Sequence, residues 1–158
     1  MGDFWDPMKA VFSSQSAVLA PSTVVDGDPV TGDAVAGFAF RRLVQITLEV
    51  TPADGDSDDK LDVYVDRSVD GAVWTNAVHF PQVLGDGGAK RYLATLDHTT
   101  TTAAATTLDY SGDAAANVVR PLVQGDQLRV RLVPTFPVEV PADDPAPSFT
   151  ASVVAIGE

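Results

Sequence analysis

The sequence contains no cysteine and only two histidines, His79 and His98, among its 158 residues. The absence of cysteine excludes a disulfide framework, a thiolate zinc site and a cysteine nucleophile. A zinc site based on histidine would need both histidines to converge with a carboxylate, and nothing in their spacing requires this. We therefore interpret His79, beside Phe80 on an expected strand, as structural, and His98 as part of a surface loop.

Common catalytic motifs are absent as well. The sequence has no Gly-x-Ser-x-Gly elbow and no Gly-x-x-x-x-Gly-Lys phosphate loop. The glycine-rich stretch at 85–88 carries an aspartate where a phosphate would bind, so it is predicted to be a turn. A Ser-His-Asp triad built from distant positions stays open. With two histidines and no thiol, the sequence nevertheless favours a protein that is not an enzyme.

Basic residues are few, since ten Lys and Arg stand against 22 Asp and Glu, a formal charge of −12. Such a surface repels nucleic-acid phosphates and anionic lipid head groups, so we expect neither nucleic acid nor membrane as a partner. No run approaches the ~20 apolar residues that cross a bilayer. The first residues are acidic, unlike the basic start of a signal peptide. The charge suits an abundant component of a particle, or a protein from a salty habitat.

Glutamate is also scarce. Nineteen of the acidic residues are Asp and three are Glu, while Val occurs 23 times and Thr 14 times. Asp favours turns and caps, and Val and Thr favour strands. This composition is typical of strands joined by turns.

Alternation of apolar and polar residues predicts strands with one buried face. The clearest alternation runs from Val44 to Thr51, and Phe38 and Phe40 are expected to extend that strand. Further strands are expected at 16–20, 22–25, 61–66, 73–80, 91–96, 117–123, 128–132 and 149–156. The fold class is therefore all-β, a single-domain antiparallel β-sandwich or jelly-roll-like barrel of about eight or nine strands.

Three segments stand apart from this pattern. Residues 1–15 place apolar side chains at helical spacing and are predicted to form an N-terminal arm or short helix. Packing on its own domain is slightly favoured for this arm over reaching a neighbouring subunit. The domain itself covers 16–158. It includes a long excursion at 97–116, rich in Thr and Ala, and a Pro-rich segment at 134–147 that is not expected to form a central strand.

An acidic loop at 54–59 is the candidate metal site. Asp54, Asp56 and Asp58 have the alternate spacing of the first ligands in a calcium-binding loop. The loop then departs from that pattern, because Asp59 replaces the glycine and Val65 replaces the final glutamate. A solvated hairpin tip is the favoured interpretation. We expect no cofactor, with calcium as the alternative.

Aromatic residues and arginines mark the candidate interface, because both are enriched among interface hot spots. The residues chosen are Phe4, Trp5, Phe12, Arg41 and Arg42. Trp74 is expected in the core. Two further arginines, Arg129 and Arg131, are expected to face solvent and to balance acidic residues on a neighbouring strand.

The stretch at 61–80, LDVYVDRSVDGAVWTNAVHF, pairs an L-D-V-Y-V-x-x-S-x-D-G strand and turn with a W-x-x-x-x-x-F return. It resembles a hairpin of small virion proteins of tailed bacteriophages. The segments 91–94, 125–131 and 148–157 are similar to the same kind of protein, whereas 1–35 and 99–116 are not. The resemblance implies a β-sandwich that decorates or completes a capsid or its tail attachment, with no catalytic residues to transfer.

The resulting functional hypothesis is a virion structural protein, either a capsid decoration (cement) protein or a head-tail accessory protein. Its partners would be other capsid or tail-attachment proteins, and it would act as a homo-oligomer, with a trimer favoured. It would be located on the capsid surface or in the head-tail region. The alternative is a carbohydrate- or receptor-binding β-sandwich module, assisted by calcium. A small hydrolase on a jelly-roll scaffold is a third and weaker hypothesis.

Overall fold

The computed structural model describes residues 15–39, 41–97, 112–120, 123, 125–137, 141 and 143–158. These residues form ten β-strands and no helix, so this part of the chain holds no helix that could cross a membrane. The strands are β1 (Gln15–Val25), β2 (Val30–Thr31), β3 (Leu43–Ala53), β4 (Lys60–Ser68), β5 (Thr75–His79), β6 (Val83–Leu84), β7 (Lys90–Asp97), β8 (Val118–Val119), β9 (Gln127–Thr135) and β10 (Ser148–Gly157).

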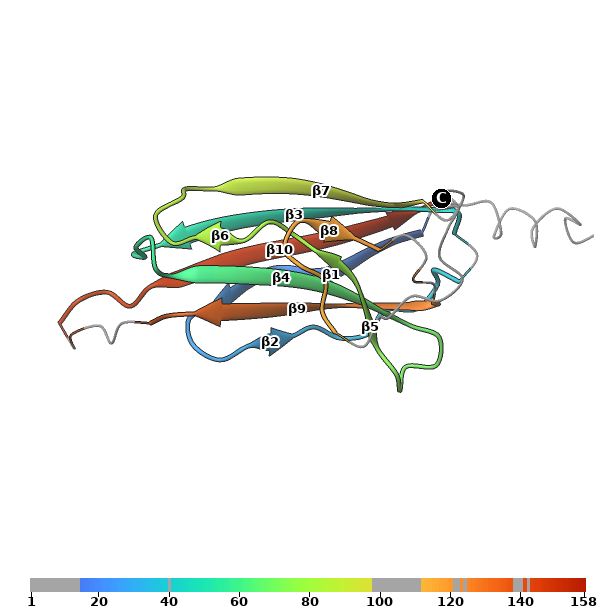
Figure 1. The fold of residues 1–158 in the computed structure, drawn as a ribbon, viewed down its shortest axis with the longest axis horizontal. Helices are drawn as coiled ribbons and strands as arrows, with labels where there is room; N and C mark the ends of the chain where they lie inside the picture. The colour runs from blue at the N-terminus through green and yellow to red at the C-terminus, as the bar shows by residue number, and fades with distance from the viewer. Residues whose placement is uncertain are drawn as a thin grey trace, which may run out of the picture.

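The strands form two antiparallel sheets that face each other, with the long strands running along the long axis of the molecule (Figure 1). Sheet A has the order β1-β10-β3-β7. Sheet B has the order β2-β9-β4-β5-β8, and the short strand β6 pairs with β4 beside this path. The predicted all-β antiparallel sandwich is confirmed. The two-residue strands β2 and β6 were not expected, and they account for the higher strand count.

The pairing of the strands is nested. If the short strands β6 and β8 are set aside, the first strand pairs with the last (β1 with β10) and the second with the next to last (β2 with β9). Inside these, β3 pairs with β7 and β4 with β5. This is a long hairpin rolled up into two facing sheets, which is the topology of a jelly roll.

The core fills the space between the sheets, and β3 shows how the sequence directs this. Val44, Ile46, Leu48 and Val50 are at most 1% exposed, while the residues between them are half-buried or exposed. The same alternation runs through β10, through β4 as far as Val65 and through β9 as far as Leu132. Each such buried side chain stabilises the fold by about 1.5–3 kcal/mol relative to its exposed state.

The first strand corrects one expectation. Instead of two short pieces, residues 15–25 form a single strand with two shifts in its register against β10, between Val18 and Ala20 and between Ala20 and Thr23. Pro21 lies inside the second shift. Proline has no N–H for the ladder, and an edge strand with bulges is where a sheet accommodates it.

Three further boundaries differ from those expected. Phe38 does not extend β3; it belongs to the β2–β3 connection and is fully buried in the core. The return strand of the β4–β5 hairpin begins at Thr75, and Val118–Val119 is the strand found among the described residues of the region around 117–123. Strand β9 continues through Pro134, because β2 pairs with β9 only as far as Leu132 and leaves the rest of β9 at an edge.

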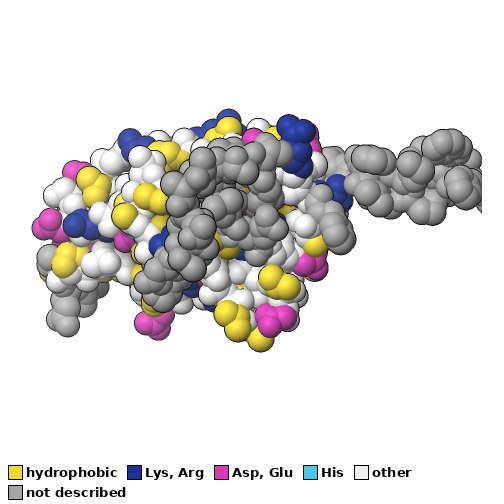
Figure 2. Space-filling view, turned by 45° about the vertical axis from the view of Figure 1, so that its right-hand side comes forward, with side chains coloured by type: hydrophobic (Ala, Val, Ile, Leu, Met, Phe, Trp, Pro, Cys, Tyr) yellow, Lys and Arg dark blue, Asp and Glu magenta, His cyan; other side chains and the backbone are white. Residues whose placement is uncertain are grey.

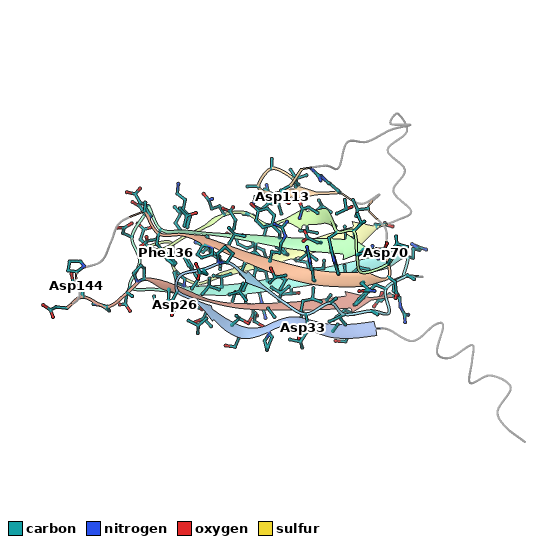
Figure 3. All side chains as sticks on the ribbon, turned by 90° about the horizontal axis from the view of Figure 1, so that it is seen from below. Asp26, Asp33, Asp70, Asp113, Phe136 and Asp144 are labelled. Atoms are coloured by element: carbon teal, nitrogen blue, oxygen red, sulfur yellow. The ribbon has the colours of Figure 1, made fainter. Side chains whose placement is uncertain are left out.

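Acidic residues collect at one end of the sandwich. The connections β1–β2, β3–β4, β6–β7 and β9–β10 meet there (Figure 1), and Figure 3 shows Asp26 and Asp144 at that end with Asp70 at the other. The aspartates of these four connections are Asp26, Asp28, Asp54, Asp56, Asp58, Asp59, Asp86, Asp143 and Asp144. Acidic side chains are also seen mainly near the margins of the face in Figure 2.

Candidate functional site

The outer face of sheet B holds the densest polar cluster in the described residues. Alternation turns Leu61, Val63 and Val65 of β4 toward the core, so the residues between them face outward. The strand register then sets two rows across β5, β4 and β9. These rows are His79–Tyr64–Arg131 and Asn76–Asp66–Arg129.

Asp66 is the centre of this cluster and is only 2% exposed. Arg131 donates to both of its carboxylate oxygens, from Nε at 2.7 Å and from Nη2 at 3.0 Å. Arg129 Nε donates to Asp66 at 3.3 Å, and Asn76 Nδ2 also donates to it at 3.3 Å. Asp66, and then Asp113, raise the pKa of Arg131 above its ordinary value, against the opposing effect of burial.

Aromatic rings cover the same cluster. Tyr64 stacks with His79 at 4.1 Å between ring centroids, and the Arg131 guanidinium lies 4.5 Å from the Tyr64 centroid. His79 Nε2 contacts Asp62 Oδ1 at 2.8 Å. Burial raises the pKa of Tyr64, and Asp62 adds to that effect while Arg131 opposes it. His79 lies on β5 beside Phe80, as predicted, and its structural role stays a prediction.

The cluster fastens the segment 112–120 to the sheet. The Ala114 amide donates to Asn76 Oδ1 at 2.9 Å, and the Ala114 carbonyl lies 2.7 Å from His79 Nδ1. Asp113, which stands over this face in Figure 3, accepts from Arg131 Nη2 at 2.6 Å. The segment 112–120 is therefore held on sheet B both by hydrogen bonds to its backbone and by the ion pair between Asp113 and Arg131.

The chemistry of this cluster is that of a structural network. One nitrogen of His79 faces a carboxylate and the other faces a main-chain carbonyl, so among the described residues its two ring nitrogens contact Asp62 and Ala114. The hollow beside Asp66, Trp74 and Asp113 measures about 240 Å³. Its arginines already pair with carboxylates, which leaves little charge to bind a ligand.

A second buried charge lies at the opposite end from the acidic connections. Arg67 of β4 is 1% exposed, and its Nη2 donates to the carbonyls of Gly125 at 2.7 Å and Phe38 at 3.1 Å. Its Nη1 donates to the Val123 carbonyl at 3.4 Å. Burial lowers the pKa of Arg67 to about 10, with Asp126 acting in the opposite direction. Arg67 thus ties two connections to the sandwich.

The acidic loop uses its carboxylates on its own backbone. Asp56 Oδ1 accepts from the amides of Asp58 at 2.8 Å and Asp59 at 3.3 Å, and Asp59 Oδ2 accepts from the Asp56 amide at 2.9 Å. The loop packs so closely on Gly85 that an added Cβ there would lie 2.6 Å from the Asp56 carbonyl oxygen. Among the described residues, Asp54 included, no three His, Asp or Glu side chains are placed to hold a metal ion. Calcium binding stays a prediction.

Two of the five predicted interface residues lie in the described part of the chain. Arg41 is half-buried, and its Nε donates to the Gly37 carbonyl at 3.4 Å, whereas Arg42 is exposed. The other three, Phe4, Trp5 and Phe12, lie outside the described residues, as do His98 and most of the excursion at 97–116. The interface formed by these five residues stays a prediction.

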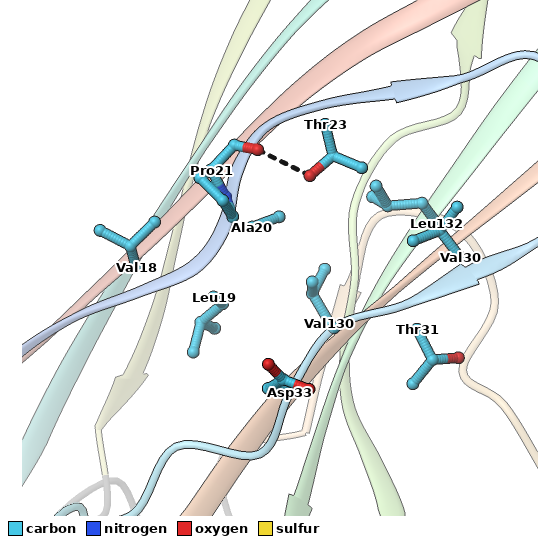
Figure 4. A pocket seen from close by; sticks show the side chains of 11 residues that line it. Val18, Leu19, Ala20, Pro21, Thr23, Val30, Thr31, Asp33, Val130 and Leu132 are labelled. Atoms are coloured by element: carbon cyan, nitrogen blue, oxygen red, sulfur yellow. Dashed lines mark hydrogen bonds between the residues drawn. The ribbon is translucent and has the colours of Figure 1, made fainter.

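An apolar groove of about 510 Å³ opens between the edge strands of the two sheets (Figure 4). Because β2 is only two residues long, sheet B leaves part of β1 uncovered. The groove is lined by Val18, Leu19, Ala20, Pro21, Thr23, Val30, Thr31, Gly32, Asp33, Val130 and Leu132. Sequence patterning could not show it, since it depends on which strands lie at the edges.

The tip of the β4–β5 hairpin is held by hydrogen bonds within the turn. Asp70 Oδ1 accepts from the amides of Ala72 at 2.9 Å and Val73 at 3.1 Å, and Trp74 Nε1 donates to the Gly71 carbonyl at 3.1 Å. Trp74 was expected in the core but is half-buried, with the Arg129 guanidinium 4.3 Å from its ring centroid. The pairing with Arg129 explains the difference, because it covers the ring on the outside of sheet B.

The strand order and the structural character of these networks define the class of the chain, a jelly-roll β-sandwich. No protein-family model matches the sequence, and no curated protein sequence matches it.

Among solved structures, the chain superposes on VP2 of infectious bursal disease virus, solved as a subviral particle, with a TM-score of 0.54 and 11% identity. The match covers 92% of this chain and 32% of the VP2 chain, so this chain spans about a third of VP2. A structure of the Gx strain of the same virus matches with a TM-score of 0.46, 11% identity and 91% coverage of this chain, again over 32% of that chain. At this identity the likeness shows the fold alone.

Proposed function

We propose that this chain is a structural protein of a virus particle and that it acts by binding other protein subunits of the shell. The observation that carries the proposal is the jelly-roll topology, which superposes over 92% of this chain on part of a protein solved as a subviral particle. A fold can host many functions, so the surfaces must support the same role. They do, because the charged side chains of the polar cluster on sheet B already pair with one another and leave little charge to bind a ligand.

The charge of the chain favours protein partners. A formal charge of −12 opposes contact with the phosphates of a packaged genome and with anionic lipids. Within a shell this leaves neighbouring protein subunits as the partners. The proposal extends to the finer role, capsid decoration or head-tail attachment in a bacteriophage, which the hairpin resemblance at 61–80 supports.

The test is the location and copy number of the chain in particles from its source. Particles are purified on a density gradient, washed in high salt and analysed by quantitative mass spectrometry. We expect peptides of this chain to sediment with the shell at a fixed ratio. A ratio near that of the major shell subunit indicates decoration, and a few copies per particle indicate a head-tail role. Recovery only from the particle-free fraction contradicts the proposal.

A further inference from the structure

The outer face of sheet A carries almost no charge. The strand register sets its outward side chains in five rows across β1, β10, β3 and β7. The rows are Leu43–Asp97, Ser16–Ile156–Gln45–Thr95, Val18–Val154–Thr47–Leu93, Ser152–Glu49–Arg91 and Val24–Thr150–Thr51. The charged members are Glu49 and Arg91, which form an ion pair with each other, and Asp97 at the end of β7. The rows between Asp97 and the ion pair carry no charge.

This face carries little charge for a chain with a formal charge of −12. Most of the other acidic residues that the structure describes lie in the connections at one end and on the outer face of sheet B, where Asp62 and Asp66 stand among arginines. Two copies of an acidic chain repel each other wherever acidic surfaces meet. The outer face of sheet A is a surface through which they can approach with little of that repulsion.

The same face gathers exposed apolar side chains. Eight large hydrophobic residues of the described chain are exposed, and half of them lie on this face: Val18 at 55%, Val24 at 55%, Leu93 at 64% and Ile156 at 43%. Val18 and Ile156 lie in adjacent rows, both next to Val154. Leu93 lies at the opposite edge of the sheet, and Val24 lies in another row. Apolar side chains gathered on one face mark an interaction site more often than single scattered ones do. The hydroxyl side chains between them add hydrogen-bonding groups without charge.

We propose that the outer face of sheet A binds a second copy of the chain, sheet against sheet, around a two-fold axis. In such a self-complementary contact, each copy presents both members of the Glu49–Arg91 pair, so each charge can also face its opposite on the partner. The inference rests on the proposed function, since it names a second copy as one of the shell partners. It gives a dimer in place of the trimer that the sequence favoured.

The size of the face sets the strength of the contact. Four strands spaced ~4.8 Å apart and about eight residues long, at ~3.3 Å per residue, present roughly 400–500 Å² on each copy. The two copies together bury roughly 800–1,000 Å², at the lower bound for a specific interface. The dimer should therefore depend on concentration in solution and be reinforced by neighbouring subunits in a particle.

The experiment is sedimentation equilibrium of the purified full chain from micromolar to millimolar concentration. Leu93→Glu and Ile156→Glu place a charge on different strands of the face, and each should weaken self-association at least about tenfold. The matched control is Val73→Glu on the hairpin tip, which is 71% exposed and adds the same charge away from the face. Thermal melting confirms that each variant is folded.

Charge reversal supplies a second, independent measurement. Glu49→Arg or Arg91→Glu alone should weaken the dimer, and the double reversal should restore it. A chain that stays monomeric at every concentration overturns the inference. So does a dimer that Val73→Glu weakens as much as Leu93→Glu does. A monomeric chain found in particles leaves the proposed function standing, whereas a dimeric chain absent from particles removes the proposed function and leaves the dimer.

Discussion

Arg131 makes its two-pronged ion pair with Asp66, which lies diagonally across the ladder, rather than with its direct neighbour Tyr64. The Arg131 guanidinium instead lies over the aromatic ring of Tyr64. This diagonal reach lets Arg131 contact Asp113 at the same time. One arginine thereby joins two strands of sheet B to the segment 112–120.

Asp66→Asn tests this arrangement. The substitution removes the charge at the centre of the cluster and leaves Arg129 and Arg131 without their shared buried counter-charge. Removing one partner of a buried pair is strongly destabilising, and we expect a loss of about 3 kcal/mol in the free energy of unfolding. Urea denaturation measures it. Glu49→Gln breaks an exposed pair as the control and should cost at most about 1 kcal/mol; equal losses would contradict the assignment.

Arg67→Lys tests the second buried charge. Lysine keeps the positive charge but lacks the planar fork that reaches the carbonyls of Phe38, Val123 and Gly125. We expect a loss of about 2–4 kcal/mol in the free energy of unfolding. The control is Arg42→Lys, the same change at an exposed position, which should stay within about 0.5 kcal/mol. A neutral Arg67→Lys would show that charge alone suffices there.

Asp70→Ala tests the pH dependence of the hairpin tip. Hydrogen bonds from the Val73 and Ala72 amides and the Ser68 hydroxyl lower the pKa of Asp70 below its ordinary value. A carboxyl group whose pKa is lower in the folded state contributes stability above its unfolded pKa, and loses it as pH falls through the folded pKa. The stability difference between wild type and Asp70→Ala should thus be constant above about pH 5 and shrink below about pH 4.

Thermal denaturation across this range measures the difference. Asp58→Ala serves as the control, since it removes a carboxylate from an exposed loop position. A gap for Asp70→Ala that widens toward acid pH would reverse the sign and refute the explanation.

The aromatic residues at the N-terminus carry a prediction about binding. Replacing Phe4, Trp5 and Phe12 together by Ser should abolish re-binding of the purified chain to particles stripped of it, because buried aromatics dominate interface energies. If these residues serve the interface rather than the fold, the melting temperature of the triple variant should stay within about a few degrees of the wild-type value. Val73→Ser is the matched control for removing an apolar side chain elsewhere. Lost stability with retained binding would assign the residues to the fold instead.

The buried faces of the long strands could be predicted from sequence, but their neighbours could not. Alternation from Val44 to Val50 identifies the buried side of β3, because the pleat places every second residue on one face. Periodicity contains no information on which strand lies beside which, so the nested order appears only in the structure. The apolar groove between the edge strands depends on that order, so the sequence could not predict the groove either.

The polar networks were predicted in part. Arg129 and Arg131 were expected to balance acids on a neighbouring strand, and Asp66 of β4 confirms this. Arg67 was missed although a signal existed, since it continues the inward alternation of Val63 and Val65. A charged residue in that position argues against burial unless its partners are known, and these partners are main-chain carbonyls from connections far away in sequence.

The nested pairing of strands has a consequence for how the chain folds. The innermost hairpin, β4–β5, closes a loop of only a few residues, whereas β1 must wait for β10, its sole ladder partner among the described strands. During synthesis, sheet A cannot be completed until β10 has left the ribosome, and β1 remains an unpaired edge until then. Because loop closure grows costlier with sequence separation, we expect folding on the millisecond-to-second scale of non-local β-proteins. We expect the β4–β5 hairpin to form first and the β1–β10 ladder to form last.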